Sequence, residues 1–507
     1  MSEKSSGGIP IQPLIGVIGW ILTVSAAGVG ALLIAYDMLS GHSNLYTGVV
    51  TYMLIPVFLS AGIAMIFVGW LTKLRRRSRH QEDKSLVLDL NNPKHVNRLK
   101  ALGIFAALFA CLSAIGGYRS YHFTESTEFC GLTCHKVMEP EFVTYHSSPH
   151  AKVSCVECHI GSGADWYVKS KMSGLRQVYA YLTNSYELPI DTPIHNLRPA
   201  RETCEECHWP EKFSGNLEKT ITHYTSEEDN HPYAVRLVLK VGGGSGEFAS
   251  GIHWHVSSGF KIEYISTDRK RLEIPWVKMT APDGKETVFT SEEFDPEILN
   301  STHEIRTMDC IDCHNRPSHI FKDPLKLVNE SIGEGKIDVK IPEIKYNVMG
   351  LLEEFYATTE EAHEKIEETL TATYLDDPEI EGATFEESVK NAIAEVKEIY
   401  SSTFFPEKHV DWTTHPDFNG HFRWDGCYRC HDGTHTADSG EVITHDCNNC
   451  HLISGQAEGF EEVANMEYEL QKFYHPMDMG ELEPEDKCTD CHEAPEPTDY
   501  VEVAKGE

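Results

Sequence analysis

Basic residues are scarce in this 507-residue chain, because 44 Lys and Arg stand against 78 Asp and Glu, which gives a formal net charge of −34 at pH 7. Nucleic acid is bound through clustered positive charge, so this balance argues against a nucleic-acid partner. A surplus of acidic side chains can steer a basic soluble protein toward a docking face, although it can equally serve only to keep a crowded surface soluble.

Charged residues are absent from three apolar stretches near the N-terminus. Each is long enough to cross a hydrocarbon core of about 30 Å as a helix, and the third is the shortest. Between the second and third stretches, residues 72–100 contain nine Lys or Arg and three acids, so the positive-inside rule places this loop in the cytoplasm. The sequence therefore predicts transmembrane helices at about 14–36, 46–71 and 101–118.

A cleavable signal peptide is not indicated at the N-terminus. The first apolar stretch is too long for one, only Lys4 precedes it as a basic residue, and no small-residue cleavage site follows it. We therefore expect an inner-membrane protein with a cytoplasmic N-terminus and a periplasmic domain that begins after about residue 121, in contact with membrane lipid.

Cysteine is nearly absent outside one repeated pattern, since Cys111 in the third apolar stretch is the only one of 15 cysteines left over. Six pairs read Cys-x-x-Cys-His, and a seventh has one extra residue between its cysteines. A zinc knuckle or a redox dithiol would explain the pairs but not the seven histidines. The pairs and the histidines are both explained if each pair forms two thioethers to a porphyrin and the adjacent histidine ligates its iron. We therefore predict seven covalently bound haem c groups. The motifs are Cys130/Cys134/His135, Cys155/Cys158/His159, Cys204/Cys207/His208, Cys310/Cys313/His314, Cys427/Cys430/His431, Cys447/Cys450/His451 and Cys488/Cys491/His492.

Covalent haem is attached on the outer side of the membrane, in agreement with the topology drawn from charge.

Seven irons also need second axial ligands. The outer region offers 17 histidines beyond those in the motifs. A single histidine is more often structural than a ligand, but the number of irons raises the chance for each one. The main candidates are His146, His150, His223, His253, His255, His319, His421, His435, His445 and His475.

The outer region divides by composition. Alternating apolar residues from Tyr233 to Val241 and a turn at Pro282–Gly284 predict strands between motifs three and four. An acidic stretch without cysteine predicts helices, the second opening on a capping box of Thr384 and Glu387. We expect a mainly α chain packed around haem, with a small β insertion. Its predicted parts are a membrane anchor (1–121), a core of four motifs (122–324) with the β insertion at about 211–305, an acidic helical spacer (325–410) and a trihaem region (411–507).

Several of these motifs together resemble one known family. They are a membrane helix leading into Glu128-Phe-Cys-Gly-Leu-Thr-Cys-His-Lys-Val-Met, the stretch Tyr145-His-Ser-Ser-Pro-His150, motif two, Lys169–Val178, motif three, and motif four with its continuation to His319. From about 101 to 324, apart from the β insertion, the chain resembles the NapC/NirT family of membrane-anchored quinol dehydrogenases. Its whole plan is similar to the heptahaem inner-membrane cytochromes of metal-respiring bacteria.

The resemblance implies where the parts of the core lie. The first haem would sit at the membrane surface beside a quinol pocket lined by Lys171, with Met138 as its distal ligand. His150 and His319 would be distal ligands of other core haems. The first motif departs from the family by its extra residue, and Met138 is third rather than second after the histidine. A purely structural role for Met138 therefore stays open.

Oxidation of a quinol releases two electrons and two protons, so its site needs a nearby iron and a proton acceptor. Ionisable groups near the first two motifs are Lys171, Asp165, Glu139 and Glu141. The leading hypothesis is a (mena)quinol dehydrogenase that passes electrons to periplasmic c-type cytochromes in anaerobic or extracellular respiration. The alternatives are an electron-relay subunit of a larger membrane complex, as a homo- or hetero-oligomer, and a terminal multihaem reductase.

Overall fold

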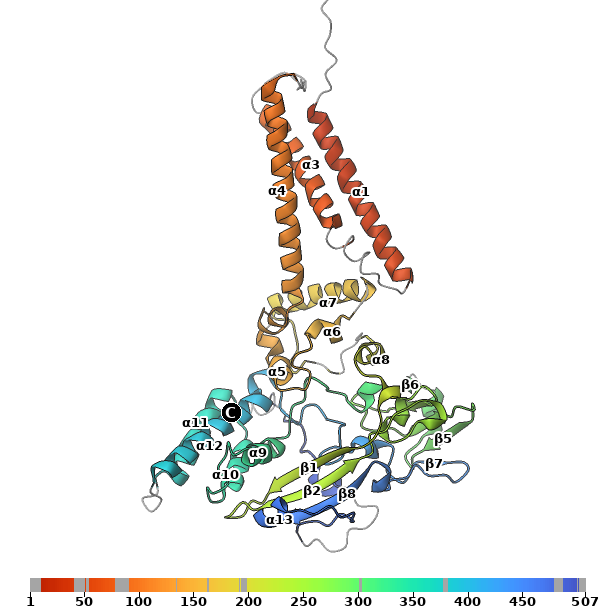
Figure 1. The fold of residues 1–507 in the computed structure, drawn as a ribbon, viewed down its shortest axis with the longest axis vertical. Helices are drawn as coiled ribbons and strands as arrows, with labels where there is room; N and C mark the ends of the chain where they lie inside the picture. Colours follow the sequence, from red (N-terminus) through yellow and green to blue (C-terminus); the bar gives the residue numbers. More distant parts are fainter. Residues whose placement is uncertain are drawn as a thin grey trace, which may run out of the picture. The chain divides into compact units, whose positions relative to one another are not determined.

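The chain forms two compact units in a computed structural model (Figure 1). Unit one comprises residues 1–134 and 154–185, and unit two comprises residues 135–153 and 186–507. The expected mainly helical chain, with apolar N-terminal helices and a smaller β part, is confirmed. The residues that the structure describes are 11–40, 51, 54–77, 91–133, 135–161, 164–190, 192, 198–300, 303–376, 382–477, 487–498 and 500.

Unit one is built on long apolar helices. Two segments, Ile15–Leu33 and Ile55–Leu74, are long and apolar enough to cross a membrane. The third predicted stretch lies within α4, where it is helical, and its crossing remains a prediction. Parts of the predicted second span (46–50 and 52–53) and of the basic loop (78–90) lie outside the described residues. The helices are α1 (Ile11–Ser40), α3 (Ile55–Arg77), α4 (Pro93–Thr124), α6 (Cys155–His159) and α7 (Ala164–Thr183).

Glycines hold α1 and α3 in close contact. A Cβ atom on Gly19 would lie 2.9 Å from the carbonyl oxygen of Gly62, and one on Gly62 would overlap the hydroxyl of Thr23. Any side chain at either position would therefore push the two helices apart. Gly19 thus serves the close packing of α1 against α3.

Unit two contains two antiparallel sheets, with strand orders β1-β2-β8 and β6-β3-β4-β5-β7. The predicted turn at Pro282–Gly284 is confirmed, because it joins β4 to β5. Strand β8 starts at His451 and β7 follows motif five, so the C-terminal stretch completes both sheets. The strands are β1 (Leu217–Tyr224), β2 (Pro232–Leu239), β3 (Lys261–Ile265), β4 (Trp276–Thr280), β5 (Glu286–Thr290), β6 (Arg306–Thr307), β7 (Thr436–Ala437) and β8 (His451–Glu458).

Residues 324–403, here called the helical region, confirm the helices expected in the acidic stretch. Their apolar faces enclose a core in which Val328, Ile366 and Leu370 are fully buried. The predicted capping box is wrong, because Gly382 is the N-cap of α12 and Thr384 lies inside that helix. The helices are α9 (Pro324–Gly333), α10 (Ile344–Leu352), α11 (Thr359–Tyr374) and α12 (Ala383–Thr403).

The remaining helices of unit two are short. Three of them contain residues of the cysteine motifs. They are α5 (His135–His146), α8 (Ala200–Cys204), α13 (Phe460–Ala464) and α14 (Thr489–His492).

Candidate functional site

The regular cysteine motifs are wound into single helical turns. In four of them the backbone N–H of the histidine donates to the carbonyl of the first cysteine over 2.8 to 3.0 Å. One such turn keeps two thiols and an imidazole within reach of a single ligand. These four histidines are His208, His314, His431 and His492.

Several motif cysteines are exposed. Cys158, Cys207 and Cys491, the second cysteines of motifs two, three and seven, are exposed, and so are Cys427 and Cys447, the first cysteines of motifs five and six. A thiol that forms a thioether has to be reached by a porphyrin from outside the backbone turn. The exposure of these five cysteines is compatible with the predicted attachment role.

The first motif is wound differently. Phe129–Thr133 forms a π-helical turn, whose hydrogen bonds span one residue more than those of an α-helix, and the extra residue of this motif lies there. A hydrogen bond from the thiol of Cys130 lowers the pKa of Cys155, the first cysteine of motif two, to about 6. Motifs one and two thus adjoin. Cys134 and the side chain of His135 lie outside the described residues.

Five motif histidines each face one histidine from outside the motifs. Three pairs of rings are nearly parallel, with interplanar angles of 10°, 15° and 16°, and two are nearly perpendicular, at 75° and 80°. The ring centroids lie 5.8 to 6.4 Å apart. The parallel pairs are His253–His314, His421–His451 and His475–His492, and the perpendicular pairs are His255–His431 and His150–His208.

This spacing fits a metal ion between the two rings of each pair. A bond from metal to imidazole nitrogen is about 2 Å, so the centroids of two imidazoles on opposite sides of one ion lie about 6 Å apart. Directly stacked aromatic rings come closer, as the 4.4 Å between Trp254 and His255 illustrates. The residues therefore fit haem iron held by two histidines.

Hydrogen bonds set the tautomer of several of these rings. The Nδ1 atoms of His150, His253, His255 and His431 lie 2.7 to 3.2 Å from backbone carbonyl oxygens. A carbonyl oxygen can only accept, so Nδ1 carries the hydrogen and Nε2 keeps its lone pair. Such contacts orient an imidazole for metal binding.

Burial favours the neutral form, which a metal ligand must have, in five rings of these pairs. Desolvation is the main cause that lowers the pKa of His314, His421, His451 and His492, and it lowers the pKa of His255 to about 4.

Five of the other predicted ligands lie outside these pairs. Both ring nitrogens of His435 are within hydrogen-bond distance of other groups, Asp432 Oδ1 at 2.9 Å and the carbonyl of Ile274 at 2.7 Å, so this ring has no nitrogen left for a metal. His223 contacts the amide of Asn329 and lies beside Phe422. Nδ1 of His319 donates to the carbonyl of Glu141 at 3.0 Å. His146 packs on Phe142 and Tyr145, and His445 lies against Gly433.

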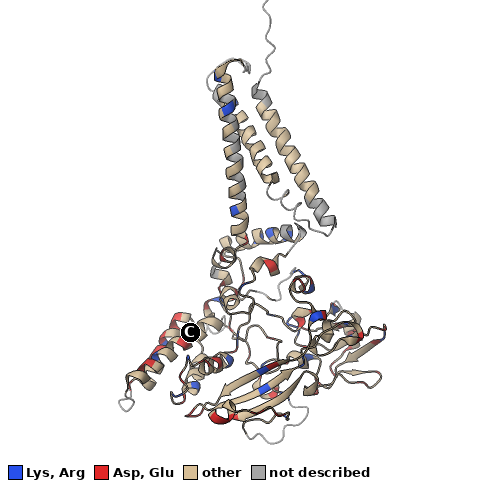
Figure 2. Ribbon diagram, viewed as in Figure 1, with Lys and Arg blue, Asp and Glu red and all other residues tan. Residues whose placement is uncertain are grey.

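Lys171 lies on α7 with a partner that the sequence did not suggest. Its Nζ is 4.0 Å from Oε1 of Glu125, the residue that caps the C-terminal end of α4. Apolar side chains at intervals of three and four residues form an exposed stripe along the same helix, which also carries basic residues (Figure 2). The stripe comprises Met172, Leu175, Tyr179 and Leu182, each 63% to 76% exposed. The side chain of Asp165, at the start of α7, lies outside the described residues.

The two predicted glutamates of α5 differ from each other. Glu139 forms an ion pair with Lys408 at 2.9 Å. Glu141 is largely buried, and burial raises the pKa of its carboxyl. Its Oε2 has no hydrogen-bond partner within the part of the chain that the structure describes. Met138 is half-buried on the same helix.

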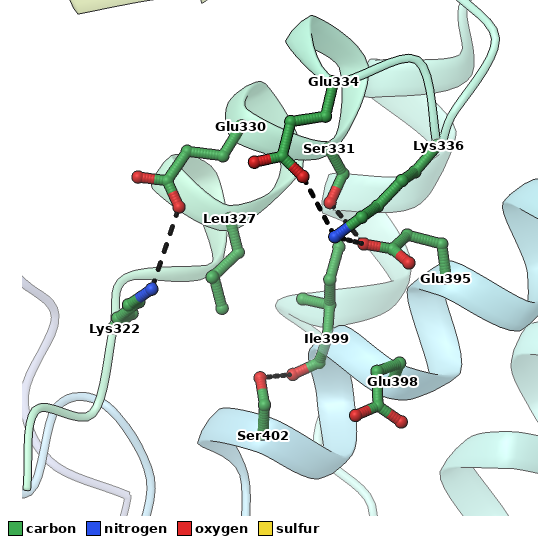
Figure 3. Close-up of a pocket in the computed structure, with 10 residues that line it drawn as sticks. All are labelled: Lys322, Leu327, Glu330, Ser331, Glu334, Lys336, Glu395, Glu398, Ile399 and Ser402. Carbon is green, nitrogen blue, oxygen red and sulfur yellow. Dashed lines mark hydrogen bonds and ion pairs between the residues drawn. The ribbon is translucent and has the colours of Figure 1, made fainter. Parts of the chain in front are cut away.

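A cavity of about 210 Å³ between α9 and α12 is separate from these sites (Figure 3). Lys336 lies 3.0 Å from Glu334 and 3.6 Å from Glu395, and the hydroxyl of Ser331 donates to Glu395 at 2.6 Å. With two lysines and four glutamates, the lining of the cavity is acidic. None of the predicted site residues lines it.

Comparison with known proteins decides the family. The chain is 42% identical to the cytochrome c-type protein ImcH of Geobacter sulfurreducens over 502 residues, which cover 97% of each protein. The chain belongs to the NapC/NirT family of cytochromes c. Residues 93–195 match the model of this family's N-terminal region. The cytochrome c-type protein NrfH of Wolinella succinogenes is 29% identical over 111 residues, 21% of this chain and 59% of NrfH. No solved structure matches the chain.

The family membership confirms the resemblance drawn from the sequence. This NapC/NirT cytochrome is a membrane-anchored multihaem protein of quinol-linked electron transfer, and as a cytochrome c it carries covalently bound haem. Sequence reasoning included the five non-motif histidines of the ring pairs among its candidates, and the resemblance implied His150 as a distal ligand. It did not name Glu125, which lies seven residues beyond the third predicted membrane helix.

Proposed function

We propose that this NapC/NirT cytochrome oxidises menaquinol at the membrane and delivers the electrons through seven haem c groups to periplasmic c-type cytochromes in anaerobic or extracellular respiration. The N-terminus would lie in the cytoplasm and the haem-binding part in the periplasm. The observation that carries the proposal is the ion pair of Lys171 and Glu125, which lies where α4 ends and beside the first motif.

When bound, each haem iron supplies a one-electron acceptor of tunable potential. The chain holds each porphyrin by two thiols, the motif histidine and a distal ligand. The five ring pairs support such ligation for motifs three to seven. For motif two we propose His319, which the resemblance implies as a distal ligand of a core haem, and for motif one Met138.

The residues around Lys171 suit the two halves of a quinol. The exposed apolar stripe of α7 can receive an apolar isoprenoid tail, and it belongs to the same unit as the apolar helices. The ammonium of Lys171 would orient the quinol head by a hydrogen bond to one hydroxyl oxygen and would stabilise the anion left on deprotonation. The carboxylate of Glu125 would accept the proton.

The test is reduction of the holoprotein by a menaquinol analogue in lipid nanodiscs. We expect the quinol to reduce the haems of the wild type and Lys171→Gln to slow this at least tenfold, since loss of one oriented charge costs about 1.4 kcal/mol or more of barrier. Glu125→Gln should slow it comparably. Dithionite, which needs no quinol site, should reduce all three proteins fully.

Lys169→Gln is the matched control, because Lys169 is on the same helix and its Nζ lies over the ring of Trp166 at 4.2 Å. It should leave the quinol rate within about twofold. If the wild type stays oxidised with the quinol while dithionite reduces it, the chain is an electron-relay subunit instead. Rapid spectral change on adding nitrite or cyanide would indicate an open iron and a terminal reductase.

A further inference from the structure

One short turn carries two histidines that belong to different motifs. His253 and His255 both lie in the 3₁₀ turn Ile252–Val256 that follows β2. The ring of His253 faces His314 of motif four, with centroids 6.4 Å apart, and the ring of His255 faces His431 of motif five, at 5.8 Å. Two ring pairs therefore depend on a single piece of backbone.

A crossing of two glycines fixes where this turn lies. Gly242 and Gly251 have φ values of +58° and +68°, and a Cβ atom on Gly251 would lie 2.7 Å from the Cα of Gly242 and 2.5 Å from the carbonyl of Lys240. Only glycine allows both the conformation and the approach. The crossing is closed by the backbone N–H of Ile252, which donates to Lys240 O at 2.8 Å.

Each ring is also tied to this backbone. Nδ1 of His253 donates to the carbonyl of Val241 at 2.9 Å, and Nδ1 of His255 donates to the carbonyl of Ile252 at 2.7 Å. Trp254 stacks on His255 at 4.4 Å. Both Nε2 atoms are consequently left with their lone pairs, in orientations that the crossing sets.

Motifs four and five meet independently of this turn. The guanidinium of Arg429, within motif five, donates to the carbonyl of Asp312, within motif four, at 2.5 Å and to the carbonyl of Arg271 at 2.8 Å. The carboxylate of Asp312 is itself held by Arg271 at 2.7 Å and by Arg306 at 2.8 Å. The two motifs are thus adjacent in a buried polar network.

We propose that Ile252–Val256 is a clip that supplies the distal ligands of two neighbouring haems, with His253 on the haem of motif four and His255 on the haem of motif five. The proposal rests on the proposed function in that both haems must be present. The clip would join the last motif of the family-like core to the first motif of the C-terminal stretch, through a segment inserted between motifs three and four.

Electron paramagnetic resonance of the oxidised holoprotein tests the clip. Low-spin ferric haem with parallel imidazoles and with perpendicular imidazoles gives separate signals. His253→Ala should remove one haem from the parallel set, and His255→Ala should remove one from the perpendicular set. Gly251→Ala should remove one haem from each set with a single substitution.

Gly284→Ala is the matched control, because Gly284 also has a positive φ, +82°, but a Cβ there meets no described atom within 4 Å. It should leave both sets unchanged. If Gly251→Ala fails to fold, the two histidine variants decide. The clip is excluded if either histidine variant leaves its set intact. It is also excluded if Gly251→Ala, with the circular dichroism and the covalent haem count of the wild type, changes fewer than two haems.

Failure of the clip is distinguishable from failure of the proposed function. In the first case the wild type still carries seven haems and is still reduced by the menaquinol analogue. In the second case the wild type itself lacks haems in the mass measurement or stays oxidised with the quinol.

Discussion

The helical region and the stretch around motifs five and six are stabilised in different ways. In the helical region Val328, Ile366, Leu370 and Val396 are fully buried against one another. Across residues 418–451 only Phe418 and Ala437 are buried apolar residues, and Cys427 and Cys447 are exposed. The helical region has a core of its own side chains, whereas the motif stretch presents thiols and imidazoles around the space that a porphyrin would fill.

This difference implies two sources of folding free energy. Burial of apolar area stabilises the helical region by about 25 cal/mol per Å². In the motif stretch the chain gains little from its own apolar contacts, so the binding free energy of the cofactor would serve as folding free energy. The helical region should therefore tolerate loss of haem, and the motif stretch should not.

Production of the chain without haem attachment would have the largest effect. We expect limited proteolysis of this apo chain to cut residues 418–451 at least tenfold faster than in the holoprotein and to spare residues 324–403, with mass spectrometry locating the cuts. Equal protection of both stretches in the apo chain would mean that the motif stretch has a core of its own.

Ile366→Ala tests the other side of the comparison. Ile366 is fully buried in the core of the helical region, so truncation should lower the free energy of unfolding of that region by about 2–5 kcal/mol. Urea unfolding followed by circular dichroism measures the loss, and the haem absorption spectrum before unfolding should not change. Tyr346→Ala is the control, because Tyr346 is 64% exposed. A changed haem spectrum in Ile366→Ala would show that the two regions are not stabilised separately.

The same contrast explains what the sequence could predict. Cysteine motifs are local patterns, so their spacing identified all seven candidate haem sites before any fold was known. The histidine ring pairs depend on contacts over long separations in the chain, such as the 176 residues between His255 and His431, which a short sequence pattern does not record. The prediction of a capping box at Thr384 and Glu387 was wrong because the same short pattern is compatible with several starting positions of a helix.

Lys345 gives a pH-dependent test within the helical region. Its Nζ donates to the carbonyl of Tyr224, and burial lowers its pKa from 10.5 to about 8. Between these values the unfolded chain binds more protons than the folded chain, so the free energy of unfolding should rise with pH across this window, by about 1–3 kcal/mol. Lys345→Met should abolish the rise in urea titrations, and the exposed Lys340→Met should keep it. A wild-type curve that falls across the window would refute the assignment.

Thr358→Ala should have the smallest effect. The hydroxyl of Thr358 accepts from the backbone N–H of Glu361 at 3.1 Å and caps α11, and the carboxylate of Glu361 accepts from the N–H of Ala357 at 2.9 Å. Loss of the cap should lower the free energy of unfolding by about 1 kcal/mol. Thr358→Ser, which keeps the oxygen, should lose less than half of that. The cap stabilises α11, which carries no predicted haem ligand, so both variants should keep the spectra of all haems. Equal loss in the two variants would assign the effect to the methyl group of Thr358 rather than to the cap.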